Sequence, residues 1–447
     1  MKASRYNHLC AIRNGRIILA YNSYSGAVAE IESENYPVVR KILDAPNAVY
    51  EGEAASFLQC LRDGGFLIPD GIDQRSALRV KARSDRLEGT ILTLTIAPTL
   101  ACNFSCDYCF ESRTGGRMSE PTQEALLAFV DRYLYRADGL RICWFGGEPT
   151  LCLPIIERLQ REFAELTRKH RLTLYPGMII TNGYLLDAAM ARQLKELGVA
   201  QAQVTLDGPR SVHDSRRKLK NGRGTFDRIL DNLCAVAGIL KINIRINIDK
   251  DNVDSAYEVV ELLQSRQVLD KVNITFAPIT PSGSVCSDII ERCHDNEEFA
   301  GALTRTYRRL LERGIRQVTF PRPSSGAACG AIAEGYFVVS PTGHLFKCWE
   351  DLSLDGAKWV GDIFSSQPSE QQLANLRAYQ SWQPLGLTEC RDCSVLPICM
   401  GGCPARGLEK PSATCGSCVT WKHNLGELLD LAYASANASP SNPNRGS

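Results

Sequence analysis

An alternation of strand-like and helix-like segments from residue 89 onward most limits how this chain can fold. The expected strands are Thr90–Ala97, Leu140–Phe145, Gly177–Thr181, Gln203–Leu206, Ile242–Ile248 and Val272–Ala277. The expected helices are Thr122–Tyr135, Leu153–Lys169, Leu186–Leu197, Phe226–Ala237, Ser255–Gln264 and Glu297–Arg313. Such alternation is typical of a parallel α/β sheet. Because six units are too few for an eightfold barrel, we predict an open, partial (β/α)6 barrel over residues 89–318.

The first 70 residues predict a separate, small α+β domain. Two β-rich runs, Tyr6–Ile12 and Arg16–Tyr21, flank Arg13-Asn14-Gly15, and Asn-Gly is a strong hairpin signal because both residues tolerate positive φ. A third run at Ala27–Ile31 and helices near Tyr36–Leu43 and Ala54–Arg62 complete it. Residues 71–88 are polar and fairly basic, and predict a linker or a loosely held helix.

The cysteines are distributed unevenly. Three of the 18 form one tight group, Cys102, Cys106 and Cys109. Eight more lie in the C-terminal third, at Cys329, Cys348, Cys390, Cys393, Cys399, Cys403, Cys415 and Cys418. Residues 319–433 otherwise show only a hairpin, Tyr336–Val339 with His344–Cys348, and a closing helix at Gly426–Tyr433, as expected where metals hold the chain. Residues 434–447 are rich in Ser, Asn and Pro and predict a disordered tail.

The net charge and the distribution of apolar residues limit which cell compartment and which classes of partner we expect. Lys and Arg total 51 against 50 Asp and Glu, which argues against a nucleic-acid partner. No apolar run reaches the roughly 18–20 residues of a membrane span, and the N-terminus lacks a secretory stretch, so we expect a cytoplasmic protein without a membrane partner. In a reducing cytosol, clustered cysteines indicate metal or redox chemistry rather than disulfides.

The segment Cys102-Asn-Phe-Ser-Cys106-Asp-Tyr-Cys109 directly follows the first expected barrel strand. Thiolates suit both iron–sulfur clusters and zinc, but a structural zinc site and a closed [4Fe–4S] cluster each take four ligands. Three cysteines on one loop favour a cluster with one open iron position. Zinc with a distant fourth ligand is the alternative.

Polar residues recur where the following strands end, which is where a barrel enzyme places its chemistry. The second strand leads into Gly146-Gly147-Glu148-Pro149, whose glycines allow a ligand close to the backbone and whose carboxylate suits an ammonium group. Further polar residues near strand ends are Thr181, Asn182, Thr205, Asp207, Arg245 and Asn247. Singly, each fits an ordinary turn or cap, but together they predict a pocket for a polar cofactor.

These motifs resemble those of the radical S-adenosylmethionine (SAM) superfamily. The triplet matches its C-x3-C-x-aromatic-C motif with Tyr108 as the aromatic, and Gly146–Pro149 matches its GGEP motif. The resemblance implies that an open iron binds the amino and carboxylate groups of SAM and that the GGEP segment contacts the methionine ammonium. Electron transfer from the cluster then cleaves SAM to a 5′-deoxyadenosyl radical, with a donor such as flavodoxin or ferredoxin. It also makes five residues candidates for contact with SAM or substrate: Thr181, Asn182, Thr205, Asp207 and Asn247.

The C-terminal cysteine spacing resembles the SPASM extension of radical SAM enzymes. Cys329-x13-Gly343-x4-Cys348 precedes a C-x2-C-x5-C-x3-C run over Cys390–Cys403. From the residues alone, a zinc ribbon is the alternative. The resemblance implies two auxiliary [4Fe–4S] clusters, the outer held by Cys390, Cys393, Cys399 and Cys418, and the inner held by Cys329, Cys348 and Cys403. Some SPASM enzymes carry a further Cys shortly before the position of Cys329, and residues 319–328 contain none, so a closed inner cluster and one with an open iron both remain alternatives. Cys415 is the alternative to Cys418.

SPASM enzymes mostly modify peptides or proteins. The N-terminal domain resembles the winged-helix-like domain with which maturases of ribosomally made peptides bind a leader as an added strand, and a purely structural cap is the alternative. We therefore predict a maturase that installs a thioether or carbon–carbon crosslink in a precursor peptide, with Glu350 and Asp351 as candidate catalytic groups by position.

Two other functions stay open. An anaerobic sulfatase-maturating enzyme that makes formylglycine is the enzymatic alternative, although Trp349 stands where such enzymes typically carry Asp. A peptide-binding scaffold stabilised by metal is the alternative without catalysis, and it predicts no cleavage of SAM.

Overall fold

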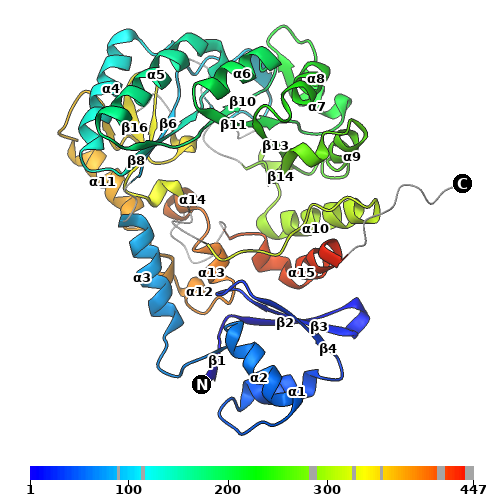
Figure 1. The fold of residues 1–447 in the computed structure, drawn as a ribbon. Helices are drawn as coiled ribbons and strands as arrows, with labels where there is room; N and C mark the ends of the chain where they lie inside the picture. The colour runs from blue at the N-terminus through cyan, green and yellow to red at the C-terminus, as the bar shows by residue number, and fades with distance from the viewer. Residues whose placement is uncertain are drawn as a thin grey trace, which may run out of the picture. The chain divides into compact units, whose positions relative to one another are not determined.

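The computed structural model describes residues 1–87, 91–111, 116–280, 289–324, 329–352, 356–409 and 418–437 (Figure 1). The chain divides into two compact units, each assembled from separate stretches of sequence. One, the barrel unit, comprises Leu87–His294 and Gly330–Ser381. The other, the terminal unit, comprises Met1–Arg86, Asp295–Cys329 and Trp382–Ser447.

The barrel unit contains six parallel strands that neighbour one another in sequence order. They are β6 (Ile91–Ile96), β8 (Gly139–Trp144), β10 (Gly177–Thr181), β11 (Val199–Thr205), β13 (Lys241–Ile248) and β14 (Val272–Pro278). Between them lie α4 (Glu120–Leu134), α5 (Leu153–Lys169), α6 (Ala188–Glu196), α8 (Phe226–Val236) and α9 (Glu258–Ser265) (Figure 1). The predicted α/β fold with an open parallel sheet is thus confirmed.

Buried aliphatic side chains hold these strands. Leu92 and Leu94 on β6, Val204 on β11 and Ile244 on β13 are fully buried. Strands of a parallel sheet carry such apolar runs because helices cover them. Helix α6 begins at Asp187, whose carboxylate accepts a hydrogen bond from the Met190 amide at 2.9 Å, so its start is fixed by an ordinary N-cap.

The sheet continues beyond β6 with strands from much later in the sequence. Strand β15 (Tyr336–Val339) pairs in parallel with β6, and β16 (His344–Phe346) and β17 (Gly361–Asp362) follow in antiparallel order. The predicted hairpin is therefore present, but it extends the barrel sheet instead of standing apart. Helix α10 (Asn296–Glu312), expected as the sixth barrel helix, lies in the terminal unit. There the Asn424 side chain of α15 (Trp421–Asn437) donates to the Ala300 carbonyl at 2.7 Å.

The N-terminal part of the terminal unit has the predicted α+β composition. Strands β2 (Asn7–Ile12), β3 (Ile17–Asn22) and β4 (Val28–Glu32) form an antiparallel sheet, and β1 (Lys2–Ala3) pairs with β5 (Leu67–Ile68). The helices are α1 (Tyr36–Asp44) and α2 (Glu53–Asp63). Positive φ at Asn14 and Gly15 closes the first hairpin, as the Asn-Gly pair predicts.

The C-terminal third contains more helix than its sequence pattern shows. Short helices occur at α11 (Glu370–Gln380), α12 (Thr388–Arg391), α13 (Leu396–Cys399) and α14 (Pro404–Glu409). The tail predicted from residue 434 begins too early, because α15 continues to Asn437 and Ser435 is buried. The Ala-rich end of this helix favours helical backbone.

Residues 71–88 contain a 14-residue helix, α3 (Gln74–Leu87). Leu78 on this helix is buried in a cluster with Tyr6, Leu385 and Leu396 of the same unit. The segment is therefore held by the core of the terminal unit. None of the helices in the described parts of the chain is long and apolar enough to cross a membrane.

We predict that Leu78→Ala destabilises the terminal unit by about 2–5 kcal/mol, because it leaves a cavity in this cluster. Urea unfolding and amide hydrogen exchange of α3 measure the effect. Val80→Ala is the matched control, since Val80 is 68% exposed on the same helix and its truncation should change stability by at most about 0.5 kcal/mol. Equal effects of the two substitutions would contradict the packing of α3.

Candidate functional site

The cysteine loop is attached to the barrel unit by a short antiparallel strand pair. Strand β7 (Phe104–Cys106) pairs with β12 (Arg217–Leu219), which follows α7 (Arg210–Arg216). In this register Arg217 lies opposite Cys106. Neither three-residue strand has a pattern long enough for prediction from sequence. The pair fixes the middle of the loop to the segment after β11.

The GGEP segment holds the beginning of the cysteine loop. The Gly147 amide donates to the Thr99 carbonyl at 3.1 Å, and the Glu148 amide donates to the Ala101 carbonyl at 2.9 Å. A Cβ on Gly147 would lie 2.4 Å from the Ala101 carbonyl oxygen, and one on Gly146 would lie 2.4 Å from that of Thr99. The glycines thus admit the backbone of the cysteine loop, and the close approach of a ligand to them stays a prediction from the sequence. Pro149 follows as the first residue of a short 3-10 helix.

Glu148 is fully buried and lies at the centre of a hydrogen-bond network. Its carboxylate accepts bonds from the Thr150 amide at 3.0 Å, the Thr181 hydroxyl at 2.7 Å and the Asn182 amide at 2.7 Å. Burial raises the pKa of Glu148, and these hydrogen bonds oppose that rise. The Asn182 side chain also donates to the side-chain oxygen Oδ1 of Asn103 at 2.7 Å. The predicted residues Glu148, Thr181 and Asn182 therefore meet beside the cysteine loop.

Tyr108 joins the other predicted strand-end residues. Its hydroxyl is hydrogen-bonded to the fully buried Asp207 and accepts from Asn247 at 3.2 Å and from Arg217 at 2.6 Å. The Asn247 amide donates to Asp207 at 3.1 Å. Three residues expected in one pocket, Tyr108, Asp207 and Asn247, are thus in one network.

Thr205 ends β11 directly opposite Arg245 on β13. Arg245 donates through Nε to the Asn247 side chain at 2.7 Å. Burial lowers the pKa of Arg245, while Tyr108, Asp207 and Glu350 oppose that change. The β13 side of this network therefore carries a half-buried cation among acidic groups.

The sequence did not single out several charged residues around this network. Arg216 is buried and pairs with the buried Asp249 at 3.0 Å. Arg292 bridges Asp249 and Asp107 of the cysteine loop, each at 2.9 Å. The adjacent arginines at 216 and 217 are a visible signal, but nothing in the sequence gives their distance from residues 107 or 249.

The donor set of the loop fits a cluster with an open position. Burial raises the pKa of the Cys102 thiol to about 12, so a thiolate there needs a bound cation. Its sulfur already accepts a 3.4 Å hydrogen bond from the Phe104 amide. Among the described residues, no three Cys, His, Asp or Glu side chains converge as ligands of a single metal ion.

Buried carboxyl groups near the loop fit a cationic cofactor. Glu111 is 7% exposed, and its Oε2 has no hydrogen-bond partner among the residues that the structure describes. Burial and the charge of Glu148 raise the pKa of Glu111 to about 8. Two such carboxyl groups suit a ligand with ammonium and sulfonium groups, as SAM has. Sequence reasoning missed Glu111, although it follows Cys109 by two positions.

The outer set of C-terminal cysteines lies in the terminal unit. A hydrogen bond from Cys418 lowers the pKa of Cys399, and the charge of Cys390 opposes that change, so these three thiols are neighbours. Lys422 Nζ lies 3.4 Å from Cys418 Sγ. Cys390 and Cys393 share one cluster of side chains. Cys415 lies outside the described residues.

The predicted inner set is divided between the units. Cys329 and Cys403 belong to the terminal unit, and Cys348 belongs to the barrel unit. Their common role stays a prediction from the sequence.

The two candidate catalytic carboxylates have different surroundings. Asp351 is 4% exposed and accepts hydrogen bonds from Lys358 at 2.7 Å and Tyr379 at 2.5 Å. Both of its oxygens are therefore engaged in holding local structure. Glu350 is half-buried, and its charge is one of those that reach Arg245. Of the two, Glu350 is therefore the one connected electrostatically to Arg245 and its network.

The radical SAM superfamily profile matches residues 96–263, which include the cysteine loop and both networks. The chain carries a radical SAM domain. It is accordingly an enzyme, and SAM and a [4Fe–4S] cluster are the cofactors of such a domain.

Relatives and solved structures extend the likeness beyond this domain. The serine-type anaerobic sulfatase-maturating enzyme of Klebsiella aerogenes is 26% identical over 339 residues, or 70% of this chain and 79% of that enzyme. The structure of native anSMEcpe with AdoMet and the Cp18Cys peptide has a TM-score of 0.56 and 21% identity, covering 77% of this chain and 97% of that chain. Streptococcus suis SuiB bound to the precursor peptide SuiA has a TM-score of 0.51 and 14% identity, covering 94% and 98%.

We predict that Gly147→Ala weakens cluster binding in the radical SAM domain by about 10–100-fold, because its methyl group would displace the backbone that positions Cys102. Iron and sulfide content after anaerobic reconstitution measures the loss. Gly116→Ala is the control, since a methyl group there meets no atom within 4 Å. Full cluster loading of Gly147→Ala would show that the close approach of the two segments is unimportant.

Proposed function

We propose that this radical SAM enzyme modifies a ribosomally made peptide by closing an intramolecular thioether or carbon–carbon crosslink. The observation that carries the proposal is the extent of the likeness to SuiB, which was solved with a precursor peptide and covers 94% of this chain. The likeness to anSMEcpe covers 77%. A chain that shares nearly its whole architecture with a precursor-peptide enzyme is expected to have a peptide substrate.

The residues of the two networks give the proposed division of work. Cys102, Cys106 and Cys109 would hold the cluster, which with SAM supplies a 5′-deoxyadenosyl radical. Glu148 would orient the methionine ammonium, since hydrogen bonds from Thr150, Thr181 and Asn182 fix its carboxylate.

Crosslinking removes two hydrogens from the peptide. The radical takes one hydrogen atom, and the second leaves as a proton with one electron. Glu350 is our candidate for accepting the proton, because it lies near the cationic edge formed by Arg245. An auxiliary cluster, with Cys390, Cys393, Cys399 and Cys418 as the ligands of the outer one, would take the electron. An external donor such as flavodoxin or ferredoxin would supply the electron for SAM cleavage.

The N-terminal sheet provides a place for the leader segment of the peptide. Among the described strands, β4 pairs with β3 alone. The Asn22 amide donates to the Ala27 carbonyl and the Ser33 amide donates to the Arg16 carbonyl, so the alternating ladder directs the amides of Val28, Glu30 and Glu32 away from β3. A leader strand would pair with these groups.

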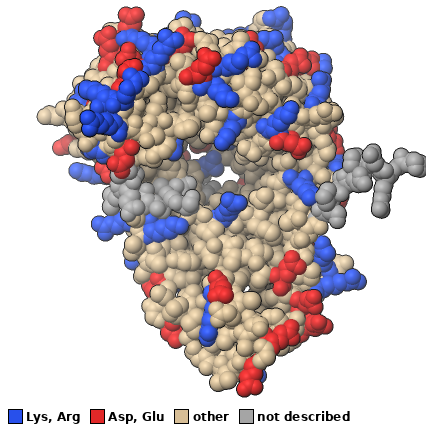
Figure 2. Space-filling view, viewed as in Figure 1, with Lys and Arg blue, Asp and Glu red and all other residues tan. Residues whose placement is uncertain are grey.

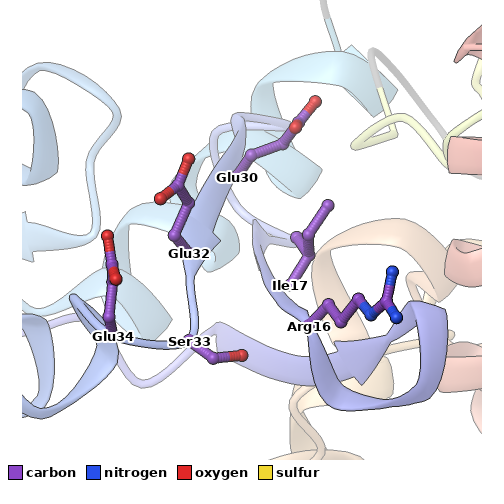
Figure 3. Close-up of a pocket in the computed structure, with 6 residues that line it drawn as sticks. All are labelled: Arg16, Ile17, Glu30, Glu32, Ser33 and Glu34. Carbon is purple, nitrogen blue, oxygen red and sulfur yellow. The ribbon is translucent and has the colours of Figure 1, made fainter.

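Acidic side chains mark the same edge. Glu30, Glu32 and Glu34 line a surface pocket with Arg16, Ile17 and Ser33, and the three carboxylates point to one side (Figure 3). In the view of Figure 2, acidic side chains gather over this part of the molecule. A leader with basic residues would complement this edge.

We predict that Glu30→Pro lowers affinity for the precursor peptide at least about tenfold, because proline removes an outward amide from the middle of the β4 edge. Fluorescence anisotropy with a labelled short peptide encoded beside the gene measures binding. Glu30→Ala is the matched control, since it also loses the 2.8 Å bond from Tyr433 but keeps the amide. Equal affinity of the two variants would place the leader elsewhere.

Co-expression of the chain with that peptide under anaerobic conditions tests the reaction. We expect a mass loss of two hydrogens per crosslink, and alkylation then separates the products, because thioether formation consumes a thiol whereas a carbon–carbon bond leaves every thiol reactive. Cys102→Ala should abolish 5′-deoxyadenosine formation, which high-performance liquid chromatography measures. An unchanged peptide with active SAM cleavage would contradict the crosslinking proposal.

The sulfatase-maturating alternative rests on the 26% identity to the Klebsiella enzyme. It predicts conversion of a Cys or Ser in a protein substrate to formylglycine, which an aldehyde-reactive probe detects. The peptide-binding scaffold without catalysis would produce no 5′-deoxyadenosine from the reduced chain and SAM.

A further inference from the structure

Arg217 is a buried cation at the edge of the cluster-binding loop. It is 8% exposed, and the register of β7 and β12 places it directly opposite Cys106. Residues directly opposite each other in an antiparallel pair have Cβ atoms about 4.5–5.5 Å apart. The guanidinium therefore belongs to the immediate surroundings of one of the three predicted cluster ligands.

One N–H group of the Arg217 guanidinium is hydrogen-bonded, and another has no hydrogen-bond partner among the described residues. Arg217 donates through Nη1 to the Tyr108 hydroxyl at 2.6 Å. Its Nε–H is buried and has no hydrogen-bond partner among the described residues. A buried donor without an acceptor costs about 1–3 kcal/mol, so a chain that keeps one here is expected to present it to a ligand.

The charged groups around Arg217 indicate which residue its guanidinium interacts with most strongly. Burial lowers the pKa of Arg217, but Cys106, Tyr108 and Asp207 together raise it well above its ordinary value, and Cys106 acts most strongly of the three. The neighbouring Arg216 also lies over the Tyr108 ring, at 5.2 Å, but its charge is paired with Asp249 at 3.0 Å. The strand register and the hydrogen bond to Tyr108 connect Arg217 to the cysteine loop, whereas the ion pair of Arg216 is with Asp249 after β13.

We propose that Arg217 is a positioning residue that raises the reduction potential of the [4Fe–4S] cluster at Cys102, Cys106 and Cys109. Its buried charge and its free N–H favour the reduced cluster, which carries one more negative charge than the oxidised one. The potential of an iron–sulfur cluster responds to net charge, to hydrogen bonds to sulfur and to solvent exclusion, and Arg217 brings to the edge of the loop a buried charge and an N–H that is unpaired among the described residues. The inference rests on the radical SAM chemistry of this loop and is independent of the peptide substrate.

A potentiometric titration of the reconstituted full-length chain tests this role. The electron paramagnetic resonance signal that changes on addition of SAM identifies the cluster with the open iron and separates it from auxiliary clusters. We expect Arg217→Met to shift its potential to more negative values by at least about 59 mV, which corresponds to a tenfold change in the one-electron equilibrium. Arg217→Lys should retain most of the wild-type potential, because it keeps the charge.

Lys218→Met is the matched control. Lys218 is the next residue of β12 and is exposed opposite Ser105, so solvent screens its charge and its loss should leave the potential unchanged. A loaded Arg217→Met variant with wild-type potential would overturn the proposal, as would an equal shift in Lys218→Met.

Failure of cluster loading is also informative. If Arg217→Met stays folded by circular dichroism but binds no cluster, while Arg217→Lys loads with near wild-type potential, the requirement for charge is supported. If Arg217→Lys also fails to load, the guanidinium acts through shape and the proposal is wrong. A wild-type chain without any SAM-sensitive signal would instead contradict the assignment of the loop to SAM chemistry.

Discussion

The close approach of two backbone segments is the constraint on which the site depends. Residues 146–148 follow β8. The Gly147 and Glu148 amides donate hydrogen bonds to the Thr99 and Ala101 carbonyls, which lie just before Cys102 in the chain. Only glycine fits at 146 and 147, because a Cβ at either would overlap a carbonyl oxygen. The start of the cysteine loop is therefore positioned by its contact with the residues that follow β8. A cluster bound by this loop would be held in place by β6 and β8.

Two further attachments hold the remainder of the loop. The β7–β12 pair fixes Cys106, and the Tyr108 hydroxyl connects the last turn of the loop to Asp207 and Asn247. Each attachment uses a residue from a different strand end or strand connection. A distortion at one of them is consequently opposed by the others, which is the usual way in which a protein holds ligands to the precision that cofactor chemistry needs.

The charged groups in the barrel unit fall into two sets, one suited to cofactor binding and one suited to influencing electron transfer. The buried carboxyl groups of Glu148 and Glu111 interact with each other and suit the cationic groups of SAM. Guanidinium groups at Arg217 and Arg245 lie on the side of Tyr108 and Asp207. In a buried site both signs act over longer distances than in water, so the positions of these groups influence both cofactor binding and electron transfer.

The sequence by itself determined the parallel α/β sheet, the cysteine triplet and the polar strand ends, because strand–helix alternation and motif spacing are local signals that survive without coordinates. Tertiary structure decided which of these residues meet. Arg217 comes 111 positions after Cys106, and β15 pairs with β6 from more than 200 residues away. In the tertiary structure, Gly146 and Gly147 contact the backbone of the cysteine loop, and Asp351 is hydrogen-bonded to Lys358 and Tyr379. Helix α10 belongs to the terminal unit and not to the barrel unit. Such contacts depend on packing between segments that are distant in the sequence, and the periodicity of apolar residues along the chain does not predict that packing.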